Sequence, residues 1–287
     1  MFNFYEFKLQ HPERFRLFRC GDALLTFYNC PLENKFADIW SQHNYIIYVT
    51  EGKKTWHTVH GPFYLQKGDC VFVRKGATIV EQFFDASFCL VIFFLPDGFI
   101  CDTLKTRSIP ITGHQKESGP VIHVVKNEKI ESFFSSMLSY FEENADPDRS
   151  LLELKFRELI LTIADNNRNA ELLSYFSSLL QEPQLVSLQK VMDDNYCFNL
   201  KLEAYAQLTN RSLSAFKRDF KKHFNNTPGK WLLEKRLDHS MQLLRAMDKT
   251  VSEAAFESGF ENTSHFSRSF KERFGVSPAA VKHKQTA

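Results

Sequence analysis

Hydrophobic and polar positions follow two different periodic patterns along the chain. Up to about residue 128, apolar residues form short runs that Gly, Pro and Asp interrupt, and the runs at 22–29, 45–51, 68–75 and 88–95 are typical of β-strands. From residue 129 onward, apolar residues recur every three or four positions, as in amphipathic helices. The pattern therefore predicts an α+β protein that is β-rich at its N-terminal end and helical at its C-terminal end.

The change of periodicity also predicts the domain boundaries. Residues 1–128 are expected to form a small barrel or sandwich, and residues 129–181 a helical segment after it. The polar run Gln-Glu-Pro-Gln interrupts the helical pattern and predicts a linker over residues 182–186. Residues 187–287 are then an all-α C-terminal domain.

The C-terminal domain contains an internal repeat. The motif F-x-R-x-F-K-x-x-F-x-x-x-P begins at Phe216 and again fifty residues later at Phe266. A short helical segment and a few turn residues precede each copy, which is the order of a helix-turn-helix unit. A long helix over residues 228–247 connects the two predicted units.

Helical geometry separates a buried face from an exposed face in each copy. At 100° per residue, Phe216, Phe220 and Phe224 form one apolar stripe, and polar side chains point away from it. The outward face holds Ser214, Arg218, Lys221 and Lys222 in the first copy, and Ser264, His265, Arg268, Lys271 and Glu272 in the second. Arg bonds guanine edges, Ser and His bond bases or phosphates, and Lys neutralises phosphate, so both faces suit a DNA major groove.

The spacing of the two motifs fits duplex DNA. A connecting helix of about twenty residues is ~30 Å long at 1.5 Å per residue, close to the ~34 Å of one duplex turn. The two helices could therefore enter successive major grooves on one side of the duplex.

The net charge of the whole chain does not by itself indicate DNA binding. The chain has 36 Lys and Arg against 34 Asp and Glu, a formal charge of +2, which taken alone disfavours nucleic acid as a partner. Residues 185–287 nevertheless carry +6 and residues 1–184 carry −4. The C-terminal domain therefore has the positive charge expected of a nucleic-acid-binding module.

The C-terminal hundred residues resemble the DNA-binding domain of AraC/XylS-type transcription regulators. The resemblance lies in Glu253-Ala254-Ala255, Ser258-Gly259-Phe260, His265-Phe266-Ser267-Arg268, Phe270-Lys271 and Phe274-Gly275-Val276-Ser277-Pro278. It implies that bases are read by Ser214, Lys217 and Arg218 in the first copy and by Thr263, Ser264, Ser267 and Arg268 in the second. It also implies a bacterial, cytoplasmic and nucleoid-associated protein that binds promoter DNA and activates transcription by contacting RNA polymerase.

The N-terminal region resembles the cupin-like sensor barrel of the same family. The matching stretch runs from Tyr45 to Gly52 and continues in Gly68-Asp69-Cys70-Val71-Phe72-Val73 and Lys75-Gly76, which is most similar to the ExsA type. Control through this barrel could come from a small molecule or, as the ExsA type implies, from a partner protein. Aromatic candidates for lining a ligand pocket are Tyr28, Trp40, Tyr48, Trp56 and Phe72.

A cupin-type enzyme with a nucleic-acid-binding tail is the alternative. Cupin enzymes hold a metal with a His-x-His pair, a Glu and a further His. Here two residues separate His57 from His60, so alternation along a strand would place them on opposite faces. The sequence therefore predicts no metal, no cofactor and no enzymatic activity.

The helical segment 129–181 has more apolar surface than a small barrel needs. We expect part of it to form a homodimer interface, with Leu152, Phe156, Leu159 and Ile163 as candidates, and packing onto the barrel is the alternative. The six Cys contain no CxxC pair, which indicates buried free thiols in a reducing cytosol. The longest apolar run, eight residues at 88–95, is too short to cross a membrane.

Overall fold

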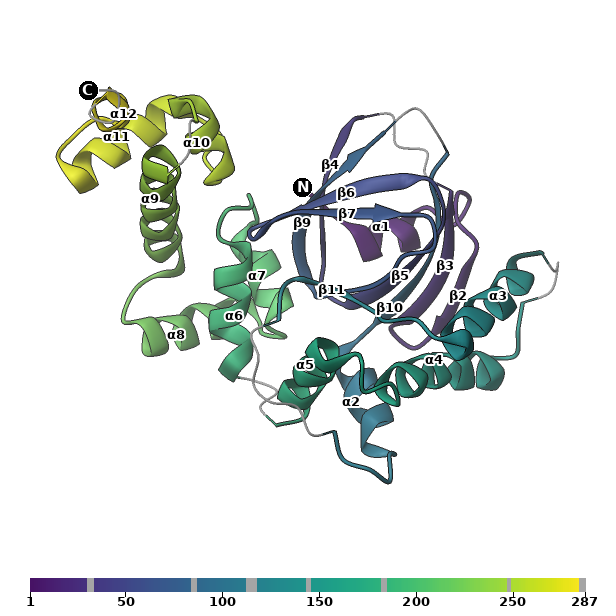
Figure 1. Ribbon diagram of the computed structural model, residues 1–287. Coiled ribbons are helices and arrows are strands. Elements are labelled where there is room, and N and C mark those ends of the chain that lie inside the picture. The colour runs from purple at the N-terminus through teal and green to yellow at the C-terminus, as the bar shows by residue number, and fades with distance from the viewer. Residues whose placement is uncertain are drawn as a thin grey trace. The chain divides into compact units, whose positions relative to one another are not determined.

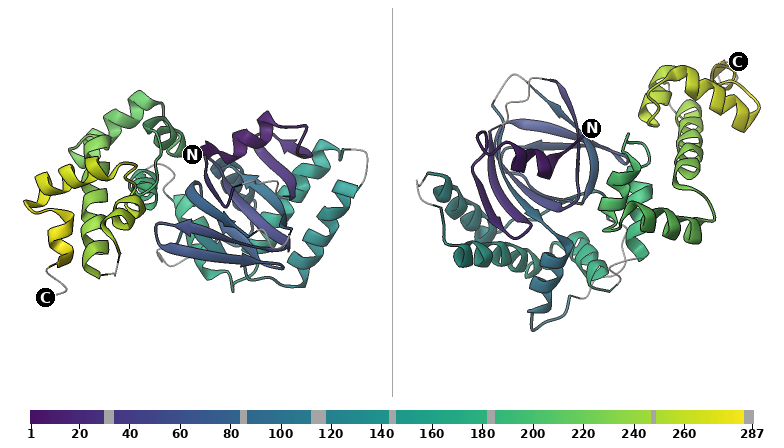
Figure 2. Two further views of the ribbon diagram at one scale, coloured as in Figure 1. Left: turned by 90° about the horizontal axis from the view of Figure 1, so that it is seen from above. Right: turned by 180° about the vertical axis from the view of Figure 1, so that it is seen from behind.

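The chain forms two compact units, Met1–Ser187 and Leu188–Ala287, seen in Figures 1 and 2. The structure, a computed structural model, describes residues 1–29, 34–83, 87–111, 118–142, 146–181, 185–246 and 249–283. The predicted α+β class is confirmed, because strands occupy the N-terminal unit and the C-terminal unit consists of helices.

Two sheets build a barrel in the N-terminal unit (Figure 1). One sheet has the order β1-β4-β9-β6-β7 and the other β11-β8-β5-β10-β3-β2. The strands are β1 (Phe2–Asn3), β2 (Leu17–Cys20), β3 (Ala23–Asn29), β4 (Phe36–Ser41), β5 (Asn44–Glu51), β6 (Lys53–Thr58), β7 (Gly61–Gln66), β8 (Cys70–Val73), β9 (Gly76–Gln82), β10 (Cys89–Leu95) and β11 (Val121–His123). The four strands predicted from apolar runs correspond to β3, β5, β8 and β10, with ends that differ by at most two residues.

Aromatic rings and the N-terminal helix fill the space between the two sheets. Helix α1 (Phe4–Gln10) buries Phe4, Tyr5 and Lys8 there. The Lys8 ammonium lies 3.3 Å from the ring centre of Tyr28 and 3.6 Å from that of Phe15. On β6, the buried Lys54 has its ammonium 4.7 Å from the ring centre of Phe88. The interior therefore combines a packed aromatic core with two buried cations, which the apolar pattern alone did not indicate.

Helices cover the outer face of the six-stranded sheet. They are α2 (Asp97–Lys105), α3 (Glu128–Glu142), α4 (Arg149–Ala164) and α5 (Ala170–Gln181). All seven residues of β10 are buried, since Leu90, Ile92 and Phe94 point between the sheets while Val91, Phe93 and Leu95 face the helices. Burial on both faces explains why this strand reads as a continuous apolar run instead of an alternating one.

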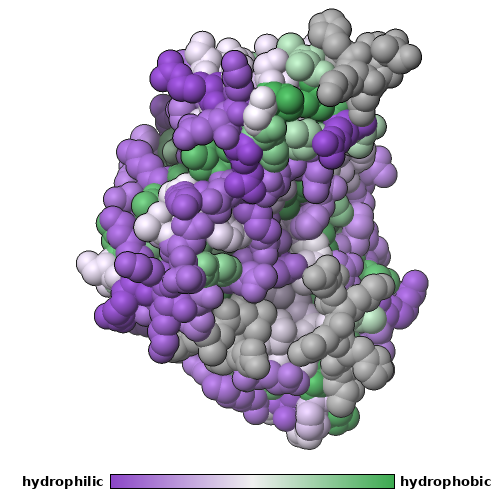
Figure 3. Space-filling view, turned by 90° about the vertical axis from the view of Figure 1, so that its left-hand side faces the viewer, coloured by the Kyte–Doolittle hydropathy of each residue, from purple (hydrophilic) through white to green (hydrophobic). Residues whose placement is uncertain are grey.

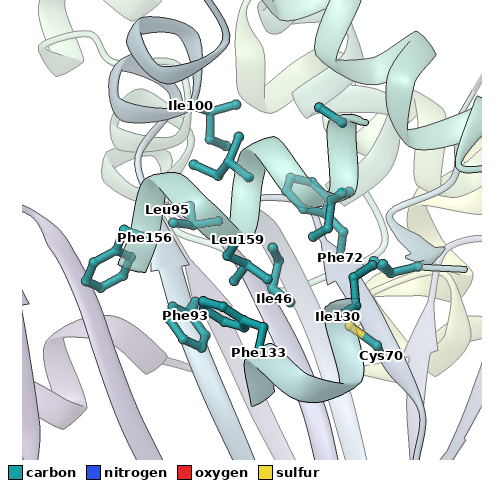
Figure 4. Close-up of a cluster of buried hydrophobic side chains, with 14 of the residues drawn as sticks. Ile46, Cys70, Phe72, Phe93, Leu95, Ile100, Ile130, Phe133, Phe156 and Leu159 are labelled. Carbon is teal, nitrogen blue, oxygen red and sulfur yellow. The ribbon is translucent and has the colours of Figure 1, made fainter. Parts of the chain in front are cut away.

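The four candidates for a dimer interface belong to this helical layer. Leu152, Phe156, Leu159 and Ile163 are each at most 3% exposed and pack into the core between α4 and the sheet. Figure 4 shows Phe156 and Leu159 beside Phe93. The expectation that these residues meet a second copy is therefore corrected: they pack within the chain. The exposed apolar residues of α4 are Leu151 and Leu154, on its opposite side.

The five candidate pocket residues do not share one site. Tyr28 and Trp56 point into the barrel, whereas Tyr48 stacks on Phe134 of α3 at 4.4 Å and Phe72 contacts Phe176 of α5 at 5.7 Å, measured between ring centres. Trp40 is half-buried and alternates with the inward-facing Ile39. The prediction of a pocket lined by all five is therefore wrong. Tyr48 and Phe72 face the helices that cover the outer side of β5 and β8, and Trp40 of β4 points away from the barrel interior.

Two further expectations concerned buried cysteines and membrane-spanning helices. Cys20, Cys70 and Cys89 are buried, Cys101 and Cys197 are half-buried, and none of these five forms a disulfide; Cys30 lies outside the described residues. Burial raises the pKa of the Cys70 thiol. Within the described ranges, no helix is both long enough and apolar enough to span a bilayer.

The C-terminal unit contains two short helix pairs on either side of a long helix. Its helices are α6 (Leu185–Asn195), α7 (Leu202–Leu208), α8 (Leu213–Phe224), α9 (Pro228–Ala246), α10 (Val251–Glu257), α11 (Thr263–Phe274) and α12 (Pro278–His283). The predicted linker 182–186 falls partly on residues 182–184, outside the described residues, and α6 already begins at Leu185. The connecting helix has the predicted start, with Thr227 Oγ1 accepting a hydrogen bond from the Lys230 amide.

Candidate nucleic-acid interface

Helices α8 and α11 begin and end with matching local structure. Ser212 caps α8 by accepting a hydrogen bond from the Ala215 amide, and fifty residues later Asn262 caps α11 through the amides of Ser264 and His265. Each helix ends at a residue in the left-handed region, Asn225 at φ 49° and Gly275 at φ 72°. The sequence repeat is therefore a structural repeat.

The apolar stripe of each helix is buried as predicted. Phe216 and Phe220 of α8, and Phe266 and Phe270 of α11, are fully buried. In α8, Phe224 stacks on Phe220 and contacts Trp231 of α9, so the stripe fixes the rotation of the helix about its axis.

This rotation presents the polar faces to solvent. The exposed candidates are Ser214, Lys217, Arg218, Lys221, Lys222, Ser264, His265, Arg268 and Lys271, while Thr263 and Ser267 are half-buried. Figure 3, which views the molecule from the side where the C-terminal helices lie in Figure 1, shows a surface that is mostly hydrophilic. All eleven predicted contact residues thus reach solvent on two helices of the same unit.

A carboxylate organises the first polar face. Asp219 Oδ1 accepts a hydrogen bond from Arg218 Nε at 3.2 Å, and Asp219 Oδ2 accepts one from Arg211 Nε at 3.1 Å. The hydrogen bond from Arg211, together with that from Arg218, holds the pKa of the Asp219 carboxyl below its ordinary value. Arg218 is nonetheless 76% exposed, so its guanidinium is oriented by Asp219 and still accessible to DNA.

The second polar face lacks this carboxylate. Ser269 takes the position of Asp219, and its hydroxyl lies 3.5 Å from His265 Nε2. Glu272 takes the position of Lys222. Near the end of α11, Arg273 makes a two-pronged ion pair with Asp238 of α9, with Nη2 2.8 Å from each carboxylate oxygen. The two helices thus share a fold but present different chemistry.

A hollow of about 940 Å³ lies beside the second helix. Its walls come from the start of α7, the first half of α9, the turn before α11 and the start of α11, and include Ser264, His265 and Arg268. Its polar groups also include Asn199, Lys201 and Arg236, which our sequence interpretation did not single out.

Several other residues of this site escaped sequence reasoning. Asp219 lies between predicted contact residues and Arg211 lies just before them, and a pair of an Arg and an Asp eight positions apart gives little signal by itself. The capping box of Thr250 and Glu253 at the start of α10 could have been found from its S/T-x-x-E spacing. Arg236 gives no local signal, because its partners are backbone carbonyls distant in sequence.

The histidines considered for a metal site have other surroundings. His57 Nε2 lies 2.9 Å from Glu81 Oε2, and Lys35 lies 3.1 Å from the other oxygen of that carboxylate. His60 lies in the turn between β6 and β7. The described part of the chain contains no group of three or more His, Cys, Asp or Glu side chains arranged to hold a metal ion.

Comparisons with known proteins agree with this architecture. Residues 44–175 match the family of the ExsA N-terminal regulatory domain, and residues 205–284 match a helix-turn-helix domain family. The virulence regulon transcriptional activator VirF of Yersinia enterocolitica is 27% identical over 236 residues, covering 82% of this chain and 87% of that protein. The regulator ExsA of Pseudomonas aeruginosa is 25% identical over 243 residues, covering 81% of this chain and 84% of that protein.

Among solved structures, ToxT of Vibrio cholerae with a bound unsaturated fatty acid aligns over 91% of this chain and 94% of that one, at 12% identity and a TM-score of 0.42. The sequence relatives are named transcription regulators, and residues 205–284 match a helix-turn-helix domain, so this chain is a DNA-binding regulator and not a cupin enzyme. The chain belongs to the AraC type of transcription regulators, with an N-terminal regulatory domain of the ExsA kind.

Proposed function

We propose that this regulator activates promoters by placing α8 and α11 in two successive stretches of major groove. The observation that carries the proposal is the repeated geometry: two equally capped helices bury their phenylalanines and expose Ser, Arg and Lys at matching positions. Arg218 and Arg268 suit bidentate bonds to guanine, and Lys221 and Lys271 suit phosphate. Ser214, Lys217, Lys222, Thr263, Ser264, His265 and Ser267 complete the proposed contact set.

The length of α9 supports reading by both helices at once. Its 19 residues span about 28 Å at 1.5 Å per residue, comparable with the ~34 Å of a duplex turn. One protomer would then cover two half-sites on one side of the DNA.

Activation would proceed through RNA polymerase, and two copies would act together. The similar protein VirF is named a transcriptional activator, which supports activation over repression. With the inner side of α4 buried, its outer side with Leu151 and Leu154 is the face on which we place a homodimer contact. A cytoplasmic protein bound to the nucleoid is the setting that this role requires.

Control would come through the N-terminal unit, from a protein partner in preference to a small molecule. The barrel interior is occupied by its own rings, with Phe4 in contact with Tyr28, Tyr45 and Phe94. Polar contacts attach the last helix of the N-terminal unit to the barrel. There Tyr175 of α5 donates a hydrogen bond to Asn44, whose amide donates to Asp97 at 2.7 Å, and Lys75 lies 2.6 Å from Asp97.

The decisive experiment is selection of bound duplexes from a random pool, followed by footprinting. We expect the wild-type protein to protect two half-sites about one turn apart. Arg218→Ala should weaken protection of one half-site and Arg268→Ala that of the other, while Lys105→Ala on the exposed end of α2 should change neither. Unaltered protection in both arginine variants would contradict the proposal.

A further inference from the structure

The segment 196–199, between α6 and α7, touches both the connecting helix and the second helix-turn-helix unit. We refer to it as the interlock loop. Arg236, from the middle of α9, donates from Nε to the Tyr196 carbonyl at 2.6 Å and from Nη2 to the Phe198 carbonyl at 2.9 Å. Hydrogen bonds from a charged donor are roughly twice as strong as neutral ones. Two of them from one planar group fix the loop on α9 in a single orientation.

The second unit packs against the same loop at Gly259, in the turn between α10 and α11. Gly259 has φ +87°, and a Cβ placed on it would lie 2.5 Å from the Cys197 carbonyl oxygen and 3.1 Å from Arg236 Nε. Any side chain would be excluded there both by the backbone conformation and by the neighbouring loop. Two residues further on, Glu261 accepts a hydrogen bond from the side chain of Asn199. The loop is therefore held between α9 and the turn that leads into α11.

Other contacts attach the interlock loop, α6 and α11 to α9. The Tyr196 ring meets the His239 ring edge-on at 5.5 Å, and Lys235 lies 3.0 Å from Asp193 of α6. In the second helix-turn-helix unit, Arg273 of α11 pairs with Asp238 of α9. Burial raises the pKa of the Tyr196 hydroxyl to about 12, in keeping with a loop that packs closely at its start.

We propose that the interlock loop fixes the distance and angle between α8 and α11, and that it thereby makes the spacing of the two half-sites a determinant of specificity. Arg236 and Gly259 are the positioning residues. Inserting one base pair moves a half-site by about 3.4 Å and turns it by roughly 34°. A pair of helices held by a clamped loop cannot follow that displacement, whereas a pair joined only by a flexible connection can. This inference rests on the proposed entry of both helices into the groove.

The first test needs no DNA. Spin labels on non-canonical amino acids at positions 222 and 272, at the exposed ends of α8 and α11, report the distance between the two helices in the full chain. We expect a narrow distance distribution in the wild type and a broad one in Arg236→Met and Gly259→Ala. Arg245→Met, elsewhere on α9, is the matched control and should stay narrow. Circular dichroism verifies that each variant keeps its helices.

The second test uses the duplex selected by the wild type, with zero, one or two base pairs inserted between its half-sites. One insertion should weaken wild-type and Arg245→Met binding by about 30-fold or more, and Arg236→Met and Gly259→Ala binding by less than about 5-fold. A distance distribution that stays narrow in both positioning variants would overturn the interlock, as would spacing selectivity equal to that of the wild type. Failure of the groove assignment itself would appear separately, as unchanged binding by Arg218→Ala and Arg268→Ala.

Discussion

Arg218 and Arg268 occupy the same position in the two helix-turn-helix units, but only Arg218 is followed by a carboxylate that accepts its Nε–H, at 3.2 Å. Asp219 holds the Arg218 guanidinium in place, whereas Ser269 offers Arg268 no carboxylate. We expect Arg218→Ala and Arg268→Ala each to cost about 1–3 kcal/mol of specific binding free energy. Titration of the selected duplex measures both, with Lys105→Ala as control. A loss below about 0.3 kcal/mol in both variants would remove these arginines from the recognition set.

Asp219→Asn tests the carboxylate directly. The negative charge lies between Arg211 and Arg218, where it would oppose binding of phosphate while it orients Arg218. We expect the variant to bind unrelated duplex more tightly, with a salt slope steeper by about one unit, and to discriminate less well in favour of the selected site. Binding at several salt concentrations gives both quantities. Unchanged affinity for unrelated duplex would show that Asp219 is remote from the DNA backbone.

His239 should make stability depend on pH. Its ring packs against Tyr196, its Nδ1 is buried without a hydrogen-bond partner among the described residues, and burial lowers its pKa from the ordinary value of 6.5. A histidine that resists protonation when folded contributes full stability above its unfolded pKa. That contribution falls as the pH drops below about 6.5.

His239→Phe keeps the ring contact and removes the titration. We expect it to flatten the fall in unfolding free energy between pH 7 and 5.5, as measured by urea denaturation. His43 has its pKa lowered by burial as well, so part of the slope should persist in the variant. His11→Gln, at a half-exposed position near the surface, is the control. A profile identical to that of the wild type would exclude His239 as a contributor.

The two sides of α4 should respond differently to truncation. Phe156 is fully buried and contacts Phe93, so Phe156→Ala should cost about 3–5 kcal/mol of unfolding free energy. Leu154 is 63% exposed, so Leu154→Ser should change stability by less than about 0.5 kcal/mol. If α4 forms the homodimer contact with its outer side, Leu154→Ser should instead lower the dimer fraction in sedimentation. A dimer unaffected by this change would move the interface elsewhere.

The recognition helices could be predicted because their determinants are local. A repeated motif with three phenylalanines at helical spacing defines both the buried side and, by subtraction, the exposed one. Phe216 and Arg218 lie where this pattern places them.

The partner of an apolar face could not be predicted in the same way. The stripe of Leu152 and Phe156 fits a second copy as well as it fits the sheet of its own chain, since periodicity describes a face and not what covers it. Strands buried on both sides gave the same difficulty. Residues 45–49 of β5 and all four residues of β8 are apolar, so alternation could not tell that Tyr48 and Phe72 face helices instead of the barrel interior. Arg236 was missed because its role depends on carbonyl groups about forty residues away.

The polar faces of α8 and α11 differ, so the two recognition helices are not equivalent. Lys222 is matched by Glu272 and Asp219 by Ser269, so under the proposed groove binding the two halves of a binding site would not be interchangeable. A site of this kind has polarity: turning it around on the chromosome presents each helix with the wrong half. Each protomer would then bind in one direction along the duplex, and a promoter could encode by the orientation of its sites which way the bound regulator faces.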